Sequence, residues 1–165
     1  MMLTRLSDLL AEVSRVFAAL ACALLAVLIT YVVFQRFVME ATPHWAEELP
    51  RLVLVWSAFI GGVVCSRDRS HLTAGILPYI VSDVRIRNAI GRINHVLVII
   101  GLVALGYAGW LVAQLTMDQM LPALDISAGM VYLALPVACS VTIVVHLAQL
   151  FEPLPSITEF LPIKD

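Results

Sequence analysis

Residues 93–117 read INHVLVIIGLVALGYAGWLVAQLTM, with no Asp, Glu, Lys or Arg between Arg92 and Asp118. The hydrocarbon core of a bilayer is about 30 Å thick, and about 20 apolar residues in a helix cross it. In lipid every backbone N–H and C=O group must be bonded within its own element, so this stretch must be a helix. It predicts one transmembrane helix, and the same pattern recurs along the chain.

Three further runs are uncharged, at residues 16–35, 52–66 and 126–151. The second would span only about 22 Å as a helix, so it must start a turn earlier to cross fully. With 61% hydrophobic and 13% charged residues, the chain is expected to be an all-α integral membrane protein, one membrane domain over 1–165. The expected segments are transmembrane helices at about 16–38, 47–66, 93–117 and 126–151, and a C-terminal tail at 152–165.

Composition excludes several classes of protein. The formal net charge is −2 and basic residues are few, so no nucleic-acid partner is expected. The cysteines, Cys22, Cys65 and Cys139, are odd in number and lack a CxxC spacing, which argues against a disulfide framework or a zinc site. No nucleophile–base constellation, phosphate loop or metal-ligand spacing is present, so neither an enzyme nor a cofactor is expected.

The arginines indicate an orientation. The connection from Arg67 to Arg92 holds half of all Lys and Arg residues, whereas residues 118–125 hold none. Cytoplasmic loops carry an excess of positive charge. Both termini and the Arg-rich connection are therefore predicted to be cytoplasmic.

Residues 71–92 are too polar to span a membrane and too apolar for an open loop. Ile86 and Ile90 lie on one side of a helix drawn through this stretch, and Arg85 and Arg92 lie on the opposite side. A basic amphipathic segment beside the cytoplasmic leaflet is expected to lie in the membrane interface and contact lipid. The alternative is a helix packed on the cytoplasmic end of the bundle.

Helix starts and breaks have local signals. Residues 3–15 carry leucines at helical spacing, which predicts an amphipathic lead-in continuous with the first crossing. Ser82 or Asp83 could cap the helix that follows. Pro136 is expected to kink the last helix.

Small residues recur at a spacing of four on the predicted helices, which lets membrane helices approach closely. The pairs are Ala58 with Gly62, Ala104 with Ala108, and Gly109 with Ala113.

The second predicted helix carries charged and aromatic residues at both ends. Those at its start are Trp45, Glu47, Glu48 and Arg51, with Trp56 further along; those at its end are Arg67, Arg69 and His71. The helix dipole favours acidic residues at the start, and Arg51 lies one turn from both glutamates and could pair with either. We expect these residues to anchor the helix ends or to contact a partner protein.

Two other functions compete. His95 and His146 lie near the cytoplasmic ends of their helices, which would suit a haem-bearing membrane anchor of a respiratory complex. A small multidrug exporter needs a carboxylate inside the membrane, and no uncharged run contains one.

The stretches WAEELPR (45–51), WSAFIG (56–61) and RDRSHL (67–72) together resemble the DctQ-type small membrane subunit of tripartite ATP-independent periplasmic (TRAP) transporters. Ala74 and Gly75 stand where that family often has an acidic residue. The resemblance implies a bacterial inner-membrane protein that is a non-catalytic scaffold. It also implies two partners: a large multi-helix subunit that holds the substrate and sodium sites, and a periplasmic binding protein that delivers an organic acid.

Overall fold

The computed structural model describes residues 2–68 and 83–152. Within them, four helical segments are long and apolar enough to cross a membrane. They are α1 (Met2–Phe37), α2 (Glu48–Arg67), α4 (Val84–Leu115) and the pair α5 (Gly129–Tyr132) and α6 (Ala134–Phe151). Strands β1 (Met120–Leu121) and β2 (Ile126–Ser127) form a short antiparallel hairpin before α5. The expectation of an all-α integral membrane protein with four crossings is confirmed.

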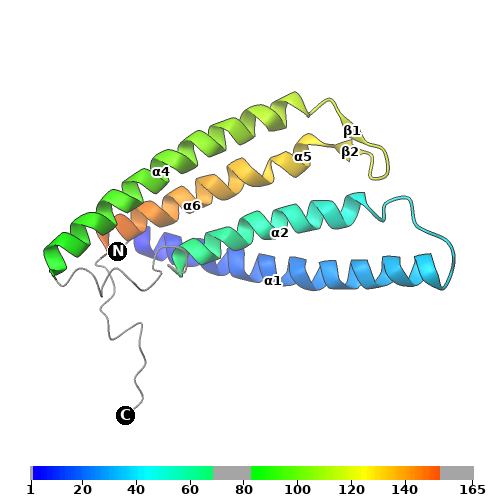
Figure 1. Ribbon diagram of the computed structural model, residues 1–165, viewed down its shortest axis with the longest axis horizontal. Coiled ribbons are helices and arrows are strands. Elements are labelled where there is room, and N and C mark those ends of the chain that lie inside the picture. The colour runs from blue at the N-terminus through cyan, green and yellow to red at the C-terminus, as the bar shows by residue number, and fades with distance from the viewer. Residues whose placement is uncertain (1, 69–82, 153–165) are drawn as a thin grey trace, which may run out of the picture.

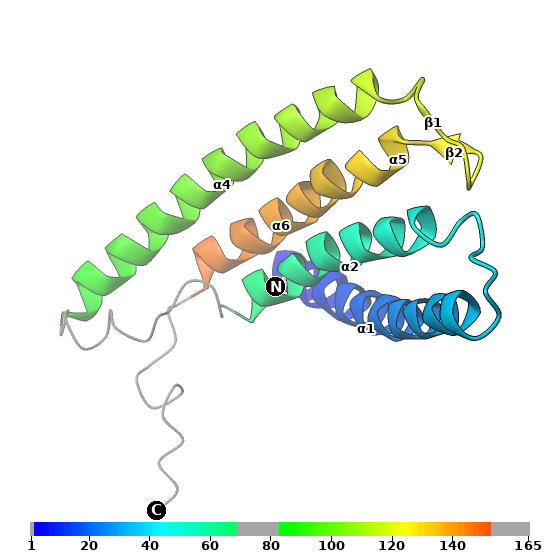
Figure 2. The same ribbon diagram turned by 45° about the vertical axis from the view of Figure 1, so that its right-hand side comes forward.

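The helices lie side by side in the order α4, α6, α2, α1, which both views show (Figures 1 and 2). Helix α6 packs against both α4 and α2, and α1 packs mainly against α2. The core lies between α2 and α6 and contains Ile60, Val63, Ala138 and Val145. The flanking helices α1 and α4 leave most of their apolar side chains exposed, as lipid-facing helices do.

The bundle has two ends (Figure 1). The start of α1, the end of α2, the start of α4 and the end of α6 meet at one end, called here the Arg67 end. The connection from α1 to α2 and the β-hairpin lie at the other, called here the Glu48 end.

Three helices begin before their uncharged runs: α1, α4 and, by the additional turn that was expected, α2 at Glu48. Helix α1 runs without a break from Met2, which confirms the lead-in. Helix α4 starts at Val84, where the Asp83 carboxylate accepts a hydrogen bond from the Arg85 N–H at 2.8 Å. Residues 84–92, expected to be the second part of the interfacial arm, thus form the first turns of α4, because no proline interrupts them. The start of the membrane-spanning part at residue 93 stays a prediction. The first part of the expected arm, residues 71–82, lies outside the described residues.

Proline 136 interrupts the fourth crossing as expected. A proline lacks an N–H group and its ring clashes with the carbonyl four residues earlier, which belongs to Tyr132. Helix α5 ends at that residue and α6 begins at Ala134. The Trp56 indole on α2 donates to the Met130 carbonyl in α5 at 3.0 Å, so a neighbouring helix supports the interrupted segment.

Glycines allow α4 to approach the fourth crossing closely. A Cβ atom on Gly109 would lie 2.9 Å from a methyl carbon of Leu135, and one on Gly129 would lie 2.7 Å from the Ala113 carbonyl oxygen. The predicted pair Gly109 and Ala113 therefore lies in this interface. The other two pairs do not pack inside the described part of the chain. Ala58, Ala104 and Ala108 are exposed, and nothing lies within 4 Å of a Cβ built on Gly62.

This difference predicts opposite effects for two glycine substitutions. Gly129→Ala should lower the free energy of unfolding by about 1–3 kcal/mol, because the new methyl group overlaps a backbone carbonyl. Gly62→Ala should leave it unchanged or raise it by up to about 1 kcal/mol, because alanine favours a helix. Thermal unfolding of both variants in detergent measures the difference, and equal midpoints would contradict the close approach of α4 and α5.

Candidate functional site

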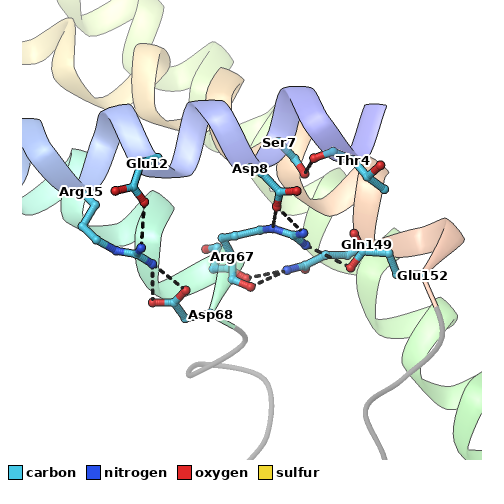
Figure 3. Close-up of polar contacts among 10 residues, drawn as sticks. Thr4, Ser7, Asp8, Glu12, Arg15, Arg67, Asp68, Gln149 and Glu152 are labelled. Carbon is cyan, nitrogen blue, oxygen red and sulfur yellow. Dashed lines mark hydrogen bonds and ion pairs between the residues drawn. The ribbon is translucent and has the colours of Figure 1, made fainter. Parts of the chain in front are cut away.

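Arg67 joins three elements at the Arg67 end (Figure 3). Its Nε and Nη2 atoms donate to Oδ1 of Asp8 on α1 at 2.9 and 2.6 Å, and Nη1 donates to Oε2 of Glu152 after α6 at 3.0 Å. The planar guanidinium group can bind two carboxylates at once. Arg67, expected to face a partner protein, therefore has partners within its own chain.

Gln149 on α6 binds the end of α2 (Figure 3). Its side chain is 1% exposed, and Nε2 donates to the carbonyls of Ser66 at 2.9 Å and Arg67 at 3.1 Å. Both carbonyls lie in the last turn of a helix, where no intrahelical N–H group is available. One amide thus caps α2 from the neighbouring helix.

A second ion pair at this end lies nearer the solvent. Arg15 on α1 donates to Asp68 at 3.0 Å and to Glu12 at 2.9 Å (Figure 3). All three side chains are at least half exposed, and such pairs contribute about 0–1 kcal/mol. Arg67 is therefore the stronger link between α1 and α2.

His95 and His146 contact each other between α4 and α6. Their Nδ1 atoms are 3.0 Å apart, and the residues are 4% and 2% exposed. A haem iron bound by both rings would lie between them with one histidine on each face, which holds the two ligand nitrogens about 4 Å apart at the usual metal–nitrogen distance. This direct contact leaves no space for one, so the pair does not fit a haem anchor. Within residues 2–68 and 83–152, no three His, Cys, Asp or Glu side chains could hold a metal ion.

Glu48 binds the turn of the β-hairpin at the opposite end. Its Oε2 atom accepts hydrogen bonds from the N–H groups of Ala123 at 3.0 Å and Leu124 at 3.2 Å. The expected ion pair between Arg51 and a glutamate is absent among the described residues, and Arg51 and Glu47 are exposed. The Leu124 amide also donates to the Leu121 carbonyl of β1 at 3.3 Å, whereas Glu48 is the acceptor that the structure gives the Ala123 amide.

The aromatic residue at this end has a local partner. Trp45 stacks on Tyr31 of α1, with ring centroids 5.9 Å apart and planes 7° apart. This contact holds the α1–α2 connection against the first helix.

The remaining predicted residues fall into two groups. Arg69 and His71 lie outside the described residues. The other four, on the first turns of α4, are exposed: Arg85, Ile86, Ile90 and Arg92. Sequence reasoning missed Asp8, Gln149 and Glu152, although a lone glutamine in an apolar run was a usable signal.

These features define a multi-pass helical membrane protein whose charged side chains lie at the two ends of the bundle. A family model described as "Tripartite ATP-independent periplasmic transporters, DctQ component" matches residues 25–156. The chain belongs to this family, which confirms the resemblance seen in its sequence. A Haemophilus influenzae protein described as "Putative TRAP transporter small permease protein" is 26% identical over 113 residues, which cover 67% of this chain and 68% of that protein.

Two arginine substitutions test the network at the Arg67 end. Arg67→Gln should lower the free energy of unfolding by about 1.5–3 kcal/mol, because charge-assisted hydrogen bonds to two elements are lost. Arg15→Gln, which removes an exposed pair, should cost less than about 1 kcal/mol. Unfolding midpoints in detergent measure both. Equal costs would show that Arg67 does not join the helices.

Glu48 and Glu47 provide a matched test at the Glu48 end. Glu48→Ala should accelerate hydrogen exchange most at the Ala123 amide, which loses its acceptor, and less at the Leu124 amide, which also donates to the Leu121 carbonyl. Glu47→Ala should leave both rates unchanged, because Glu47 is exposed and does not bind the turn. Exchange followed by mass spectrometry on peptides covering residues 118–128 measures the rates. Equal protection in both variants would exclude the contact.

Proposed function

We propose that this chain is the scaffold subunit of a sodium-coupled TRAP transporter and holds no transport site of its own. The transporter takes up an organic acid that a periplasmic binding protein delivers. The main support is the position of the charges. No Asp, Glu, Lys or Arg lies in the middle of any apolar run, whereas pathways for ions and charged substrates are built from such residues.

The distribution of arginines supports a place in the bacterial inner membrane with both termini in the cytoplasm. The Arg67 end carries most of the basic residues: Arg5, Arg15, Arg67, Arg85, Arg87 and Arg92. The Glu48 end has Arg36 and Arg51 among several acidic residues. By the positive-inside rule the Arg67 end faces the cytoplasm.

The large subunit is proposed to dock on the exposed side of α2. Glu48, Trp56 and Arg67 have partners within the chain, which leaves Arg51 and the small pair Ala58 and Gly62 unused. Small residues let a second membrane helix approach closely. Glu47, Trp45, Arg69 and His71 would extend this contact beyond the two ends of the helix.

The segment 71–92 is proposed to lie at the cytoplasmic surface and hold the scaffold against tilting while the large subunit moves. Ile86 and Ile90, which are exposed, would enter the lipid, and Arg85 and Arg92 would meet the phosphates. Each arginine near anionic lipid contributes about 1 kcal/mol.

Two leucine substitutions at open glycine positions test the proposal. Gly62→Leu on α2 should reduce co-purification with the large subunit several-fold, because the added side chain keeps the partner helix away. Gly101→Leu on α4 is the control, since no atom lies within 4 Å of a Cβ at either position. Both variants should fold alike alone.

The same preparations are tested for transport in liposomes. Sodium-driven uptake with binding protein present should require both membrane subunits and should fall in parallel with complex yield. Uptake by this chain alone would disprove the scaffold role. Equal complex yields for the two variants would place the docking surface elsewhere.

A further inference from the structure

Two buried histidines join α4 to α6 near the Arg67 end. The Nδ1 atoms of His95 and His146 lie 3.0 Å apart, which is a hydrogen-bond distance. The two rings are inclined to each other by 53°, with their centroids 5.3 Å apart. This contact takes no part in the proposed transport function.

The charged network at this end of the bundle does not hold α4. Among the described side chains, its ion pairs join α1 to α2 and α2 to the residue that follows α6. Gly106 and Gly109 let α4 approach the fourth crossing, but they lie further along the helix toward the Glu48 end (Figure 1). The His95–His146 contact is therefore a polar attachment of α4 in a region where the ion pairs leave it out.

A direct contact between two Nδ1 atoms limits how many protons the pair can hold. An imidazole nitrogen accepts a hydrogen bond only while it carries no proton. In the uncharged pair one Nδ1–H group donates to the other Nδ1, and the accepting ring carries its own proton on Nε2. One further proton goes to Nε2 of the donating ring. The hydrogen bond then has a charged donor and becomes stronger.

A second added proton has the opposite effect. The accepting Nδ1 is the last unprotonated nitrogen of the four, so this proton must replace the hydrogen bond. Two N–H groups would then point at each other, and two positive rings would lie side by side in a buried site, where like charges repel strongly. The contact can therefore exist with one positive charge on the pair but not with two.

The surrounding side chains do little to offset this repulsion. The charged and titratable groups on the elements around the pair are Arg92 on α4, Cys139 on α6, Glu152 after α6, Arg67 on α2 and Asp8 on α1. The two carboxylates are bound to Arg67. A thiol is uncharged in neutral and acidic solution. Arg92, which lines a small pocket together with His95, adds a further positive charge nearby.

We propose that the His95–His146 contact is an acid-sensitive attachment of α4. It holds the helix against α6 while the pair carries at most one positive charge, and it breaks when the pair takes up a second proton. Residues 84–95 belong to one unbroken helix, so the first turns of α4 then move away from α6 as a unit.

NMR of the full-length chain in detergent, labelled with ¹⁵N-histidine, tests the proposal. In neutral solution a scalar coupling between two Nδ1 atoms should be detected across the hydrogen bond, with one nitrogen protonated and the other not. The coupling should survive the uptake of the first proton and disappear with the second, in a titration that extends to about pH 4. His44 is exposed in the α1–α2 connection and reports the titration of an accessible imidazole in the same sample.

His146→Gln separates the histidines from other acid-sensitive groups. Glutamine can donate to His95 Nδ1 when that ring is neutral and accept from it when the ring is charged, so the contact no longer depends on pH. In the wild type the unfolded chain can take up both protons and the folded pair only one, so stability falls as the pH falls. The unfolding midpoint of the wild type should therefore decrease more steeply on acidification than that of His146→Gln. Protonation of Asp8 and Glu152 affects both proteins alike, and His44→Gln, the matched control, should behave like the wild type.

Three results would overturn the proposal. They are the absence of the coupling in neutral solution, a coupling that persists until the chain unfolds, and equal acid dependence of the midpoint in the wild type and His146→Gln. If His146→Gln does not fold, His95→Gln takes its place, and the coupling in the wild type decides independently of both variants.

Discussion

The hydrogen bonds from Gln149 to the last carbonyls of α2 are the contact on which the arrangement of helices depends. In lipid, apolar side chains gain little free energy by packing against one another instead of against acyl chains. Apolar surface alone therefore does not decide which helices become neighbours. Selection requires groups that lipid cannot satisfy. The carbonyls at the end of α2 are such groups, and α6 supplies their donor.

The other helices are held by different means. Helix α4 is positioned by close packing, because Gly106, Gly109 and Gly129 let its backbone approach the fourth crossing. Helix α1 is placed by charge, because Asp8 meets Arg67, which also binds Glu152 beyond α6. Between its two ends α1 relies mainly on packing against α2. A chain with few charged residues therefore uses several of them where helices end.

The crossings could be predicted from the sequence because a long run without charged residues is typical of a segment that lies in the hydrocarbon core. The sequence also predicted a helix capped at Ser82 or Asp83, but not that this helix continues without a break into the third crossing, because polar residues before 93 mark contact with water and not the end of a helix. The expected pairing of Arg51 with a glutamate failed for another reason. Helical spacing shows which side chains can meet, but it omits competitors such as the turn amides that bind Glu48. Gln149 joins residues 83 positions apart, which no local pattern reveals.

The lengths of the helices explain why these charges can exist beside so apolar a bundle. Helix α2 has 20 residues, about 30 Å, which matches the hydrocarbon core. Helices α1 and α4 have 36 and 32 residues, about 54 and 48 Å, so both must tilt or extend beyond it. Their surplus turns carry the polar residues and lie at the Arg67 end, beside the end of α2. Arg67 thus sits where the core of the bilayer stops, and the extended turns of α1 bring Asp8 to it. A shorter α1 would leave the guanidinium group with Glu152 alone.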